Sequence, residues 1–182
     1  MTAIEVLKRG GTLLYPTDTV WGLGCDATNA QAIEKVMSIK GRDRTKSLLI
    51  LVKDLNMLRD YVFDVPQQAF ELMKRIKEPL TIIYPQAKNL PDNLISQNGS
   101  IGIRIPQHDY CQWLLQNLGK PIVSTSANVS GKSSPASFED IDRKIKGKVD
   151  FIAPIDNDKT TTHDLASAIY LITTKGDVSR IR

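Results

Sequence analysis

Residues 121–135 read PIVSTSANVSGKSSP, and this stretch decides whether the fold is built around a P-loop. A P-loop needs Gly, any four residues and then Gly-Lys-Ser or Gly-Lys-Thr, but position 126 is a serine where the first glycine should stand. Ser134 precedes a proline, which disfavours the helix that must follow a P-loop directly. We expect the next helix to begin at Ser137, with Ser137 as its N-cap. The stretch therefore excludes a P-loop and predicts a buried strand over 121–123 that runs into a polar loop.

Apolar runs bounded by turn residues alternate along the rest of the chain with segments of helical periodicity. Strands are expected at 12–15, 48–52, 80–84, 101–105, 151–153 and 168–172, and helices at 67–77, 110–118 and 141–145. Another helix is expected between a capping box at residues 28–31, Thr-Asn-Ala-Gln, and a stop at Gly41. This alternation predicts an α/β fold, an open sheet covered by helices.

Length and composition indicate one globular domain over residues 1–182. The chain is 41% hydrophobic and 24% charged, which is ordinary for such a domain. No apolar run approaches the roughly 20 residues of a membrane span, and the N-terminal residues lack the apolar core of a signal peptide. The two cysteines and two histidines form no disulfide or metal-ligand pattern. We therefore expect a cytoplasmic protein with no membrane partner and no metal site of its own.

Three polar stretches have residue types that suit a ligand site. Residues 15–24, YPTDTVWGLG, combine hydroxyls, a carboxylate and an aromatic ring at the end of a strand. Residues 40–46, KGRDRTK, crowd cations after a helix, as a polyphosphate site or a solvated turn would. Residues 124–130 offer hydroxyls and an amide without a neighbouring histidine, which suits ligand binding and not a Ser-His-Asp nucleophile.

Arg104 and the net charge point to anions. Arg104 interrupts an apolar strand, and a buried arginine needs an anion, supplied either by another residue or by a ligand. The net charge of +4 is a weak indication of partners such as nucleotides or RNA. Taken alone, a turn with a core aromatic explains 15–24 as well as a ligand site does, a polar loop explains 124–130 as well, and a solvated turn explains 40–46 better.

Taken together, these stretches resemble the YrdC family, the threonylcarbamoyl-AMP synthases. The matching elements are PTDTVWGLG at 16–24, KGRDRTK at 40–46, SIGIRIP at 100–106, STSANVSG at 124–131 and LASAIYLI at 165–172. They follow the family's order over nearly the whole chain. The resemblance implies an open, twisted α/β sheet with helices packed on it and a positively charged concave face. It also implies the short, single-domain form of the family.

The resemblance further implies a reaction in which L-threonine, bicarbonate and ATP give threonylcarbamoyl-AMP and pyrophosphate. ATP would carry Mg²⁺ into the site, so no cage of carboxylates is needed. Other proteins, the tRNA threonylcarbamoyl-transfer proteins, would then pass the group to adenosine in tRNA. Whether tRNA also contacts this chain is a question that the resemblance leaves open.

Residue roles follow by matching motifs. The family's nucleotide-binding tetrad, of which the two cations are also the catalytic candidates, matches Lys40, Arg42, Ser126 and Asn128. Further ATP contacts match Lys46, Ser134 and Arg182. The threonine pocket matches Thr19, Arg104, Ser124 and Ser167. If Ser124 faces threonine while Ser126 and Asn128 face ATP, the chain must turn directly after Ser124.

Four positions depart from the family pattern: Trp21, Ser47, Leu51 and Ala168. Trp21 keeps an aromatic wall but lacks the hydroxyl of the usual tyrosine, and Ser47 replaces a proline. Leu51 lies near the place where some longer relatives have a threonine-contacting histidine, and Ala168 replaces a threonine. These departures concern threonine recognition more than ATP binding.

Two other functions remain open from the residues. The basic face also suits a non-catalytic module that binds tRNA or double-stranded RNA, although only 6% of the residues are aromatic and no stacking platform is evident. The other possible function is that of a carbamoyl-transfer domain, of the kind fused into larger hydrogenase-maturation proteins. The chain lacks the zinc-finger and acylphosphatase segments expected of those proteins.

Overall fold

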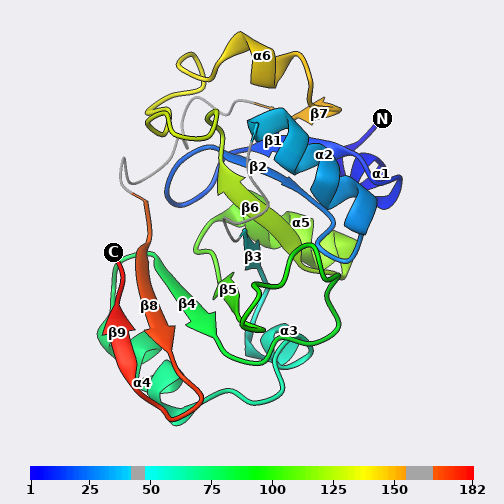
Figure 1. Cartoon of the computed structure of the whole chain (residues 1–182). Coiled ribbons are helices and arrows are strands. Elements are labelled where there is room, and N and C mark those ends of the chain that lie inside the picture. The colour runs from blue at the N-terminus through cyan, green and yellow to red at the C-terminus, as the bar shows by residue number, and fades with distance from the viewer. Residues whose placement is uncertain (42–47, 155–165) are drawn as a thin grey trace.

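The computed structural model describes residues 1–41, 48–154 and 166–182 (Figure 1). The strands in these ranges are β1 Thr12–Tyr15, β2 Gly22–Cys25, β3 Leu49–Leu51, β4 Leu80–Tyr84, β5 Ile101–Arg104, β6 Ile122–Ser126, β7 Phe151–Ile152, β8 Ala168–Ile172 and β9 Val178–Arg180. They form one sheet in the order β7-β1-β2-β6-β3-β5-β4-β8-β9. The prediction of an open α/β sheet is confirmed.

The sheet is mixed. Strand β3 is parallel to β5, β4 to β8 and β1 to β7, whereas the other neighbouring strands are antiparallel. Strand β6 stands between β2 and β3 and joins the two halves of the sheet. This central position brings the polar residues that end β6 next to both halves.

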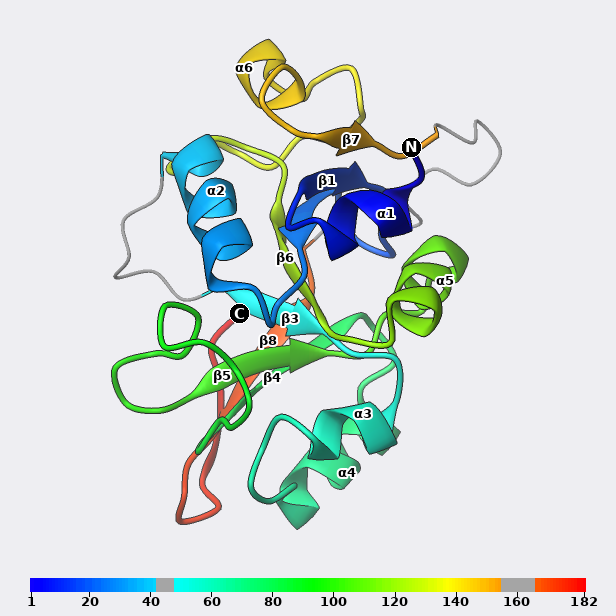
Figure 2. The same ribbon diagram turned by 90° about the vertical axis from the view of Figure 1, so that its right-hand side faces the viewer.

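The helices are α1 Ala3–Lys8, α2 Ala30–Lys40, α3 Leu55–Arg59, α4 Gln67–Arg75, α5 Asp109–Leu118 and α6 Arg143–Lys146. Figure 2 shows α1 and α5 next to each other at the right, α2 at the left, and α3 and α4 below β3 and β5. Buried leucines of α5 pack with α1 in one core cluster, and Ile33 and Val36 of α2 belong to a second cluster. Residues of α3 and α4 belong to the same cluster as those of α2, so helices cover both faces of the sheet.

Two predicted helix starts are wrong because neighbouring carboxylates bind the residues concerned. Ser137 donates from its backbone N and its Oγ to Asp140 Oδ2, at 3.0 Å each, which closes a turn, and α6 begins at Arg143 after the N-cap Asp142. Thr28 likewise donates to Asp26 Oδ1, so the N-cap of α2 is Asn29. The left-handed stop at Gly41 is confirmed.

The prediction of a loop after position 123 is also wrong, because β6 continues to Ser126. Its partner β2 was not expected from the sequence at all. A Cβ atom at Gly24 would lie 2.0 Å from the carbonyl oxygen of Val123, so the close approach of β2 and β6 requires glycine there. The elements α1, α3 and β9 were also not predicted.

Candidate functional site

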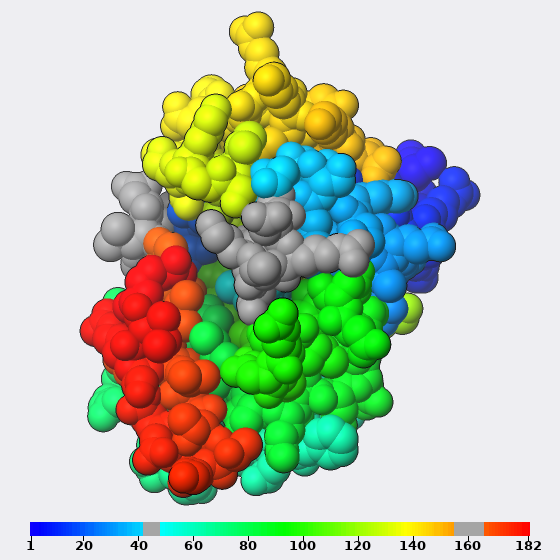
Figure 3. All heavy atoms as spheres, in the orientation of Figure 1, coloured from blue at the N-terminus to red at the C-terminus, as the bar shows by residue number. Residues whose placement is uncertain are grey.

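A cavity of about 1060 Å³ opens on the face of the sheet that carries Leu49 and Ser124, and Met37 of α2 lines one side of it. It lies over β4, β5, β6 and β8, and residues 92–98 and Ser100 form one wall. Figure 3 shows this face hollowed between the C-terminal strands in red and the green segment before β5. Pockets for small ligands commonly measure about 300–1,000 Å³, so this cavity has room for more than one small substrate.

Seven of the residues predicted from the sequence line this one cavity. The predicted threonine group contributes all four members, Thr19, Arg104, Ser124 and Ser167, and the predicted ATP group contributes Ser126, Ser134 and Arg182. Arg42 and Lys46 lie outside the described residues. Residues 100 or more positions apart in the chain therefore meet at one site.

Strand β6 presents Ser124 and Ser126 to the cavity. Side chains two positions apart on a strand point to the same face, and both serines line the cavity. The chain turns only after Ser126, where the backbone N of Asn128 donates to the Ser126 carbonyl at 2.9 Å. The expected turn directly after Ser124 is therefore wrong, and the two serines lie one after the other along a single wall.

Lys40 holds the loop that follows β6. Its side chain is only 2% exposed, and its Nζ donates to the carbonyl oxygens of Ser126 and Asn128, the latter at 2.8 Å. Nζ also donates to Asn128 Oδ1 at 3.3 Å, and the Lys40 carbonyl accepts from the Ser130 backbone N. Asn128 Oδ1 in turn accepts from Ser126 Oγ. Three of the four tetrad residues thus form one hydrogen-bonded unit.

Arg104 meets an internal carboxylate, which the sequence left as one of two possibilities. Its Nη1 lies 3.1 Å from Asp18 Oδ1 and donates to Thr19 Oγ1 at 2.9 Å. Both charged side chains are 4% exposed. Among the described residues, Arg104 Nε is buried without a hydrogen-bond partner. The guanidinium is therefore fixed through Nη1, and Arg104 lines the cavity with a buried Nε that the described residues leave unpaired.

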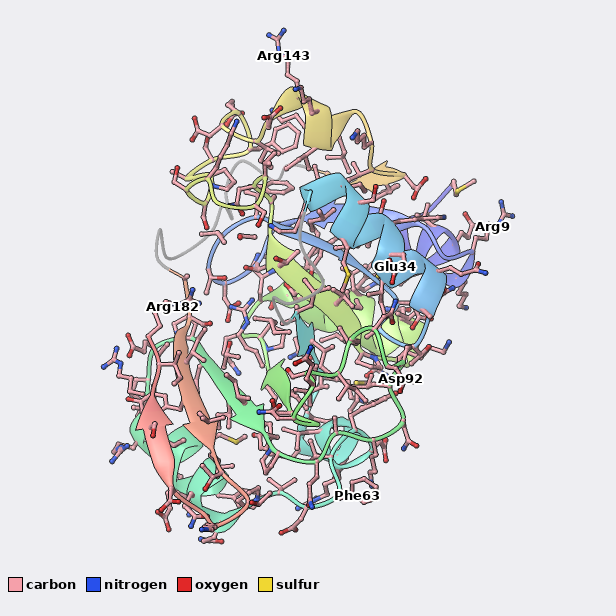
Figure 4. All side chains as sticks on the ribbon, viewed as in Figure 1. Arg9, Glu34, Phe63, Asp92, Arg143 and Arg182 are labelled. Carbon is pink, nitrogen blue, oxygen red and sulfur yellow. The ribbon has the colours of Figure 1, made fainter. Side chains whose placement is uncertain are left out.

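Ser167 and Arg182 form the opposite wall. Ser167 Oγ and Thr81 Oγ1 share a hydrogen bond of 2.8 Å, and Arg182 Nε donates to the Ser167 carbonyl at 3.0 Å. Partial burial and, to a lesser extent, the positive charge of Arg104 lower the pKa of Arg182. Figure 4 shows Arg182 beside the start of β8 at the left and Asp92 at the right, and both residues line the cavity. Two guanidinium groups at one cavity favour an anionic ligand.

The structure adds lining residues that the sequence did not single out, chiefly Thr81, Ser100 and the segment 92–98. The composition of this segment indicates a loop but not where the loop folds. Trp21 lines the cavity and packs against Phe138 with ring centroids 5.0 Å apart, so the predicted aromatic wall is present. Leu51 and Ala168 are buried, and neither is among the described lining residues.

The charge of the concave face is only partly described. The charged lining residues in the described ranges are Arg104, Arg182 and Asp92, so a strongly positive face remains a prediction. Within the same ranges, no three His, Cys, Asp or Glu residues are grouped as metal ligands. The helices that the structure describes are too short or too polar to cross a membrane.

Comparisons with known proteins agree with these motifs. The Sua5/YciO/YrdC family model, described as "Telomere recombination", matches residues 5–182. A threonylcarbamoyl-AMP synthase of Pseudoalteromonas translucida (strain TAC 125) is 38% identical over 139 residues, which cover 75% of this chain and 74% of that protein. The Bacillus subtilis (strain 168) threonylcarbamoyl-AMP synthase is 35% identical over 154 residues, which cover 81% of this chain but 44% of that protein.

Solved structures show the same fold. P. abyssi Sua5, in a crystal structure with L-threonine, superposes with a TM-score of 0.89 at 27% identity, over 99% of this chain and 52% of that one. E. coli YciO superposes with a TM-score of 0.81 at 28% identity, over 99% of this chain and 86% of that one. With a family model that spans nearly the whole chain and with relatives above 30% identity, the chain belongs to the Sua5/YciO/YrdC family.

Proposed function

We propose that this chain is a threonylcarbamoyl-AMP synthase, which converts L-threonine, bicarbonate and ATP into threonylcarbamoyl-AMP and pyrophosphate. The observation that carries the proposal is one cavity lined by both groups of residues, those matched to threonine and those matched to ATP. The names of the two curated relatives, and the L-threonine in the P. abyssi structure, support the same reaction.

In this proposal threonine binds at the Arg104 end of the cavity. The unpaired Nε of Arg104 would donate to the carboxylate of the amino acid, in a charge-assisted hydrogen bond. Thr19, Ser124 and Ser167 place hydroxyl groups around the same end, and a hydroxyl can both donate and accept. These groups suit the hydroxyl and the amine of threonine.

ATP, as its magnesium complex, would occupy the end near Ser126. Ser126, Ser134 and Arg182 line this part of the cavity, and Lys40 holds the Ser126–Asn128 loop in shape. Arg42 and Lys46 follow Lys40 in the sequence by two and six positions, so we assign them to the polyphosphate. The phosphates and water would hold Mg²⁺, which commonly keeps several waters.

The chemistry needs positioning more than a protein nucleophile. The amine of threonine combines with bicarbonate to form a carbamate and water. A carbamate oxygen then attacks the α-phosphorus of ATP, the bond from that phosphorus to the bridging oxygen breaks, and pyrophosphate leaves. Holding the reactants in line and neutralising phosphate charge can supply most of the acceleration. Arg42 is the candidate for the second task, and Lys40 would contribute by holding the Ser126–Asn128 loop.

The proposal extends to partners and location. The product is a mixed anhydride that water destroys, so proteins that transfer the threonylcarbamoyl group to tRNA must take it from this enzyme. We place the reaction in the cytoplasm, where ATP and tRNA meet. Direct binding of tRNA to this chain is a separate property that the reaction does not require.

The test measures pyrophosphate release with γ-labelled ATP and identifies the adenylate formed with α-labelled ATP. We expect release to require both L-threonine and bicarbonate. Equal ATP turnover with either substrate omitted would contradict the proposal and indicate a general ATPase. Binding of tRNA without any threonine-dependent adenylate would instead support the non-catalytic RNA-binding function.

A further inference from the structure

Asp18 is a buried carboxylate that lies behind the cavity wall. Its residue is 3% exposed, and it is not among the described residues that line the cavity. The Oδ2 atom accepts a hydrogen bond from the backbone N of Gln107 at 3.0 Å, which anchors it to the segment after β5. The Oδ1 atom lies 3.1 Å from Arg104 Nη1, a charge contact without hydrogen-bond geometry. A charge this deep requires a reason.

Arg104 is held from one side only. Nη1 faces Asp18 and donates to Thr19 Oγ1, and Thr19 is itself fixed because its backbone N donates to Thr17 Oγ1 at 3.0 Å. Nε is buried and, among the described residues, makes no hydrogen bond. A planar guanidinium fixed through Nη1 cannot rotate freely, so the direction of its Nε–H is set as well. The arrangement fixes the guanidinium of Arg104, which lines the cavity, before any ligand arrives.

We propose that Asp18 is the positioning residue of the threonine pocket, which orients Arg104 for the carboxylate of the amino acid without touching it. This inference rests on the function proposed above and goes further, because it assigns a role to a residue outside the cavity lining. Asp18 also supplies a negative charge, which offsets the two positive charges that Arg104 and Arg182 place at one cavity. Arg182 lines the same cavity as Arg104, and Asp18 offsets the repulsion between the two positive charges while the pocket is empty.

The variant Asp18→Asn keeps the size of the side chain and removes its charge. We expect the dissociation constant for L-threonine to rise about 10-fold or more, since losing one member of a buried charge pair has effects of that order. The apparent KM for ATP should stay within about twofold, because Ser126, Ser134 and Lys40 keep their contacts. Calorimetry with L-threonine alone and steady-state pyrophosphate release give the two quantities.

Asp26→Asn is the matched control. Asp26 is 4% exposed, its Oδ2 pairs with Lys120 at 3.0 Å, and its Oδ1 closes a turn with Thr28. It is not among the described cavity-lining residues. Both variants should lower the melting temperature, but only Asp18→Asn should change the dissociation constant for threonine. Equal effects of the two variants on threonine would reduce Asp18 to a structural residue and overturn the inference.

A double-mutant cycle with Arg104→Gln tests whether Asp18 acts through Arg104. The double variant should have the same kcat/KM for threonine as Arg104→Gln alone, because no charged guanidinium remains to be positioned. Additive losses would overturn the inference. If Asp18→Asn does not fold, Gln107→Pro removes the N–H that anchors Asp18 Oδ2, and it should raise the threonine dissociation constant about threefold; an unchanged constant would count against the role.

The wild-type chain separates the two proposals. Wild-type protein that binds no L-threonine overturns the proposed function, and the role of Asp18 with it. Wild-type protein that binds L-threonine, together with an Asp18→Asn variant that binds it within twofold of wild type, overturns the role of Asp18 alone.

Discussion

The two ends of the cavity use buried cations in different ways. At the Ser126 end, the described hydrogen bonds of Lys40 go to two backbone carbonyls and one amide oxygen of the loop after β6. At the other end, Arg104 contacts a carboxylate and a hydroxyl, and its buried Nε–H has no partner among the residues that the structure describes. Lys40 shapes a loop, whereas Arg104 is presented to a ligand.

The difference predicts different consequences of substitution. A lysine that satisfies buried carbonyls is needed for the shape of its loop, so its loss should affect folding and every property of the nucleotide end. An arginine with an open donor is needed for one ligand, so its replacement should affect that ligand selectively. The substitutions below test this contrast, beginning with the largest expected effect.

Lys40→Ala should lower the rate of pyrophosphate release at least about 100-fold, because two carbonyls lose their donor and the loop loses its support. It should also lower the melting temperature. Lys40→Arg should not restore activity, since a planar guanidinium cannot replace the compact ammonium. Lys35→Ala is the control on the same helix, because Lys35 Nζ donates to the Gly10 carbonyl at 2.9 Å, outside the described lining. Equal losses would show that the Lys40 contacts are incidental.

Arg104→Lys should raise the KM for threonine by roughly 10- to 100-fold, because a lysine keeps the charge beside Asp18 but loses the planar fork. The KM for ATP should change little. Arg180→Lys is the control, since Arg180 lies on the edge strand β9 and forms an exposed ion pair with Glu78. A parallel rise in both Michaelis constants would show that the two ends do not act separately.

Ser124→Ala, on strand β6, and Asn128→Ala, in the loop after it, should affect different substrates. Ser124→Ala should weaken the binding of threonine about 5- to 10-fold, which is the effect of losing one hydrogen bond in a buried site. Asn128→Ala should weaken the binding of ATP or lower kcat, because the Asn128 side chain makes hydrogen bonds with both Lys40 and the Lys132 carbonyl. The structure makes Ser126 the boundary, since β6 runs straight to that residue. If Ser124→Ala weakens only the binding of ATP, both serines of the β6 wall contact the nucleotide and neither contacts threonine.

The smallest expected effect is the slow reaction of the two cysteines with a thiol reagent, which tests whether the structure near the threonine end of the cavity opens. Cys111 Sγ lies 3.4 Å from the Pro16 carbonyl, and burial raises the pKa of this thiol to about 12. Burial raises the pKa of Cys25 as well. At pH 8 both groups are therefore protonated, and a disulfide reagent such as DTNB should react slowly with the folded chain and fully in denaturant. Rapid labelling of Cys111 at pH 8 would show that this end opens.

The sequence by itself determined the parts that depend on local interactions. Apolar runs and the residues that end them predicted seven of the strands and four of the helices, with small errors at their ends, because the period of a strand or helix is visible within a few residues. The absence of a P-loop was also decided by spacing alone. The errors at Thr28 and Ser137 arose where Asp26 and Asp140 bind the residue expected to cap a helix, so two local partners competed.

Only the tertiary structure decided which residues meet. Lys40 and Asn128 are 88 positions apart, and Thr19 and Arg104 are 85 positions apart. Their contacts follow from the order of strands, with β6 between β2 and β3, and no local pattern encodes that order. The same reason explains β2, which exists because Gly24 lets its backbone approach Val123. Asp18 is the clearest case, because its sequence neighbours indicate a turn and only folding places its carboxylate against Arg104.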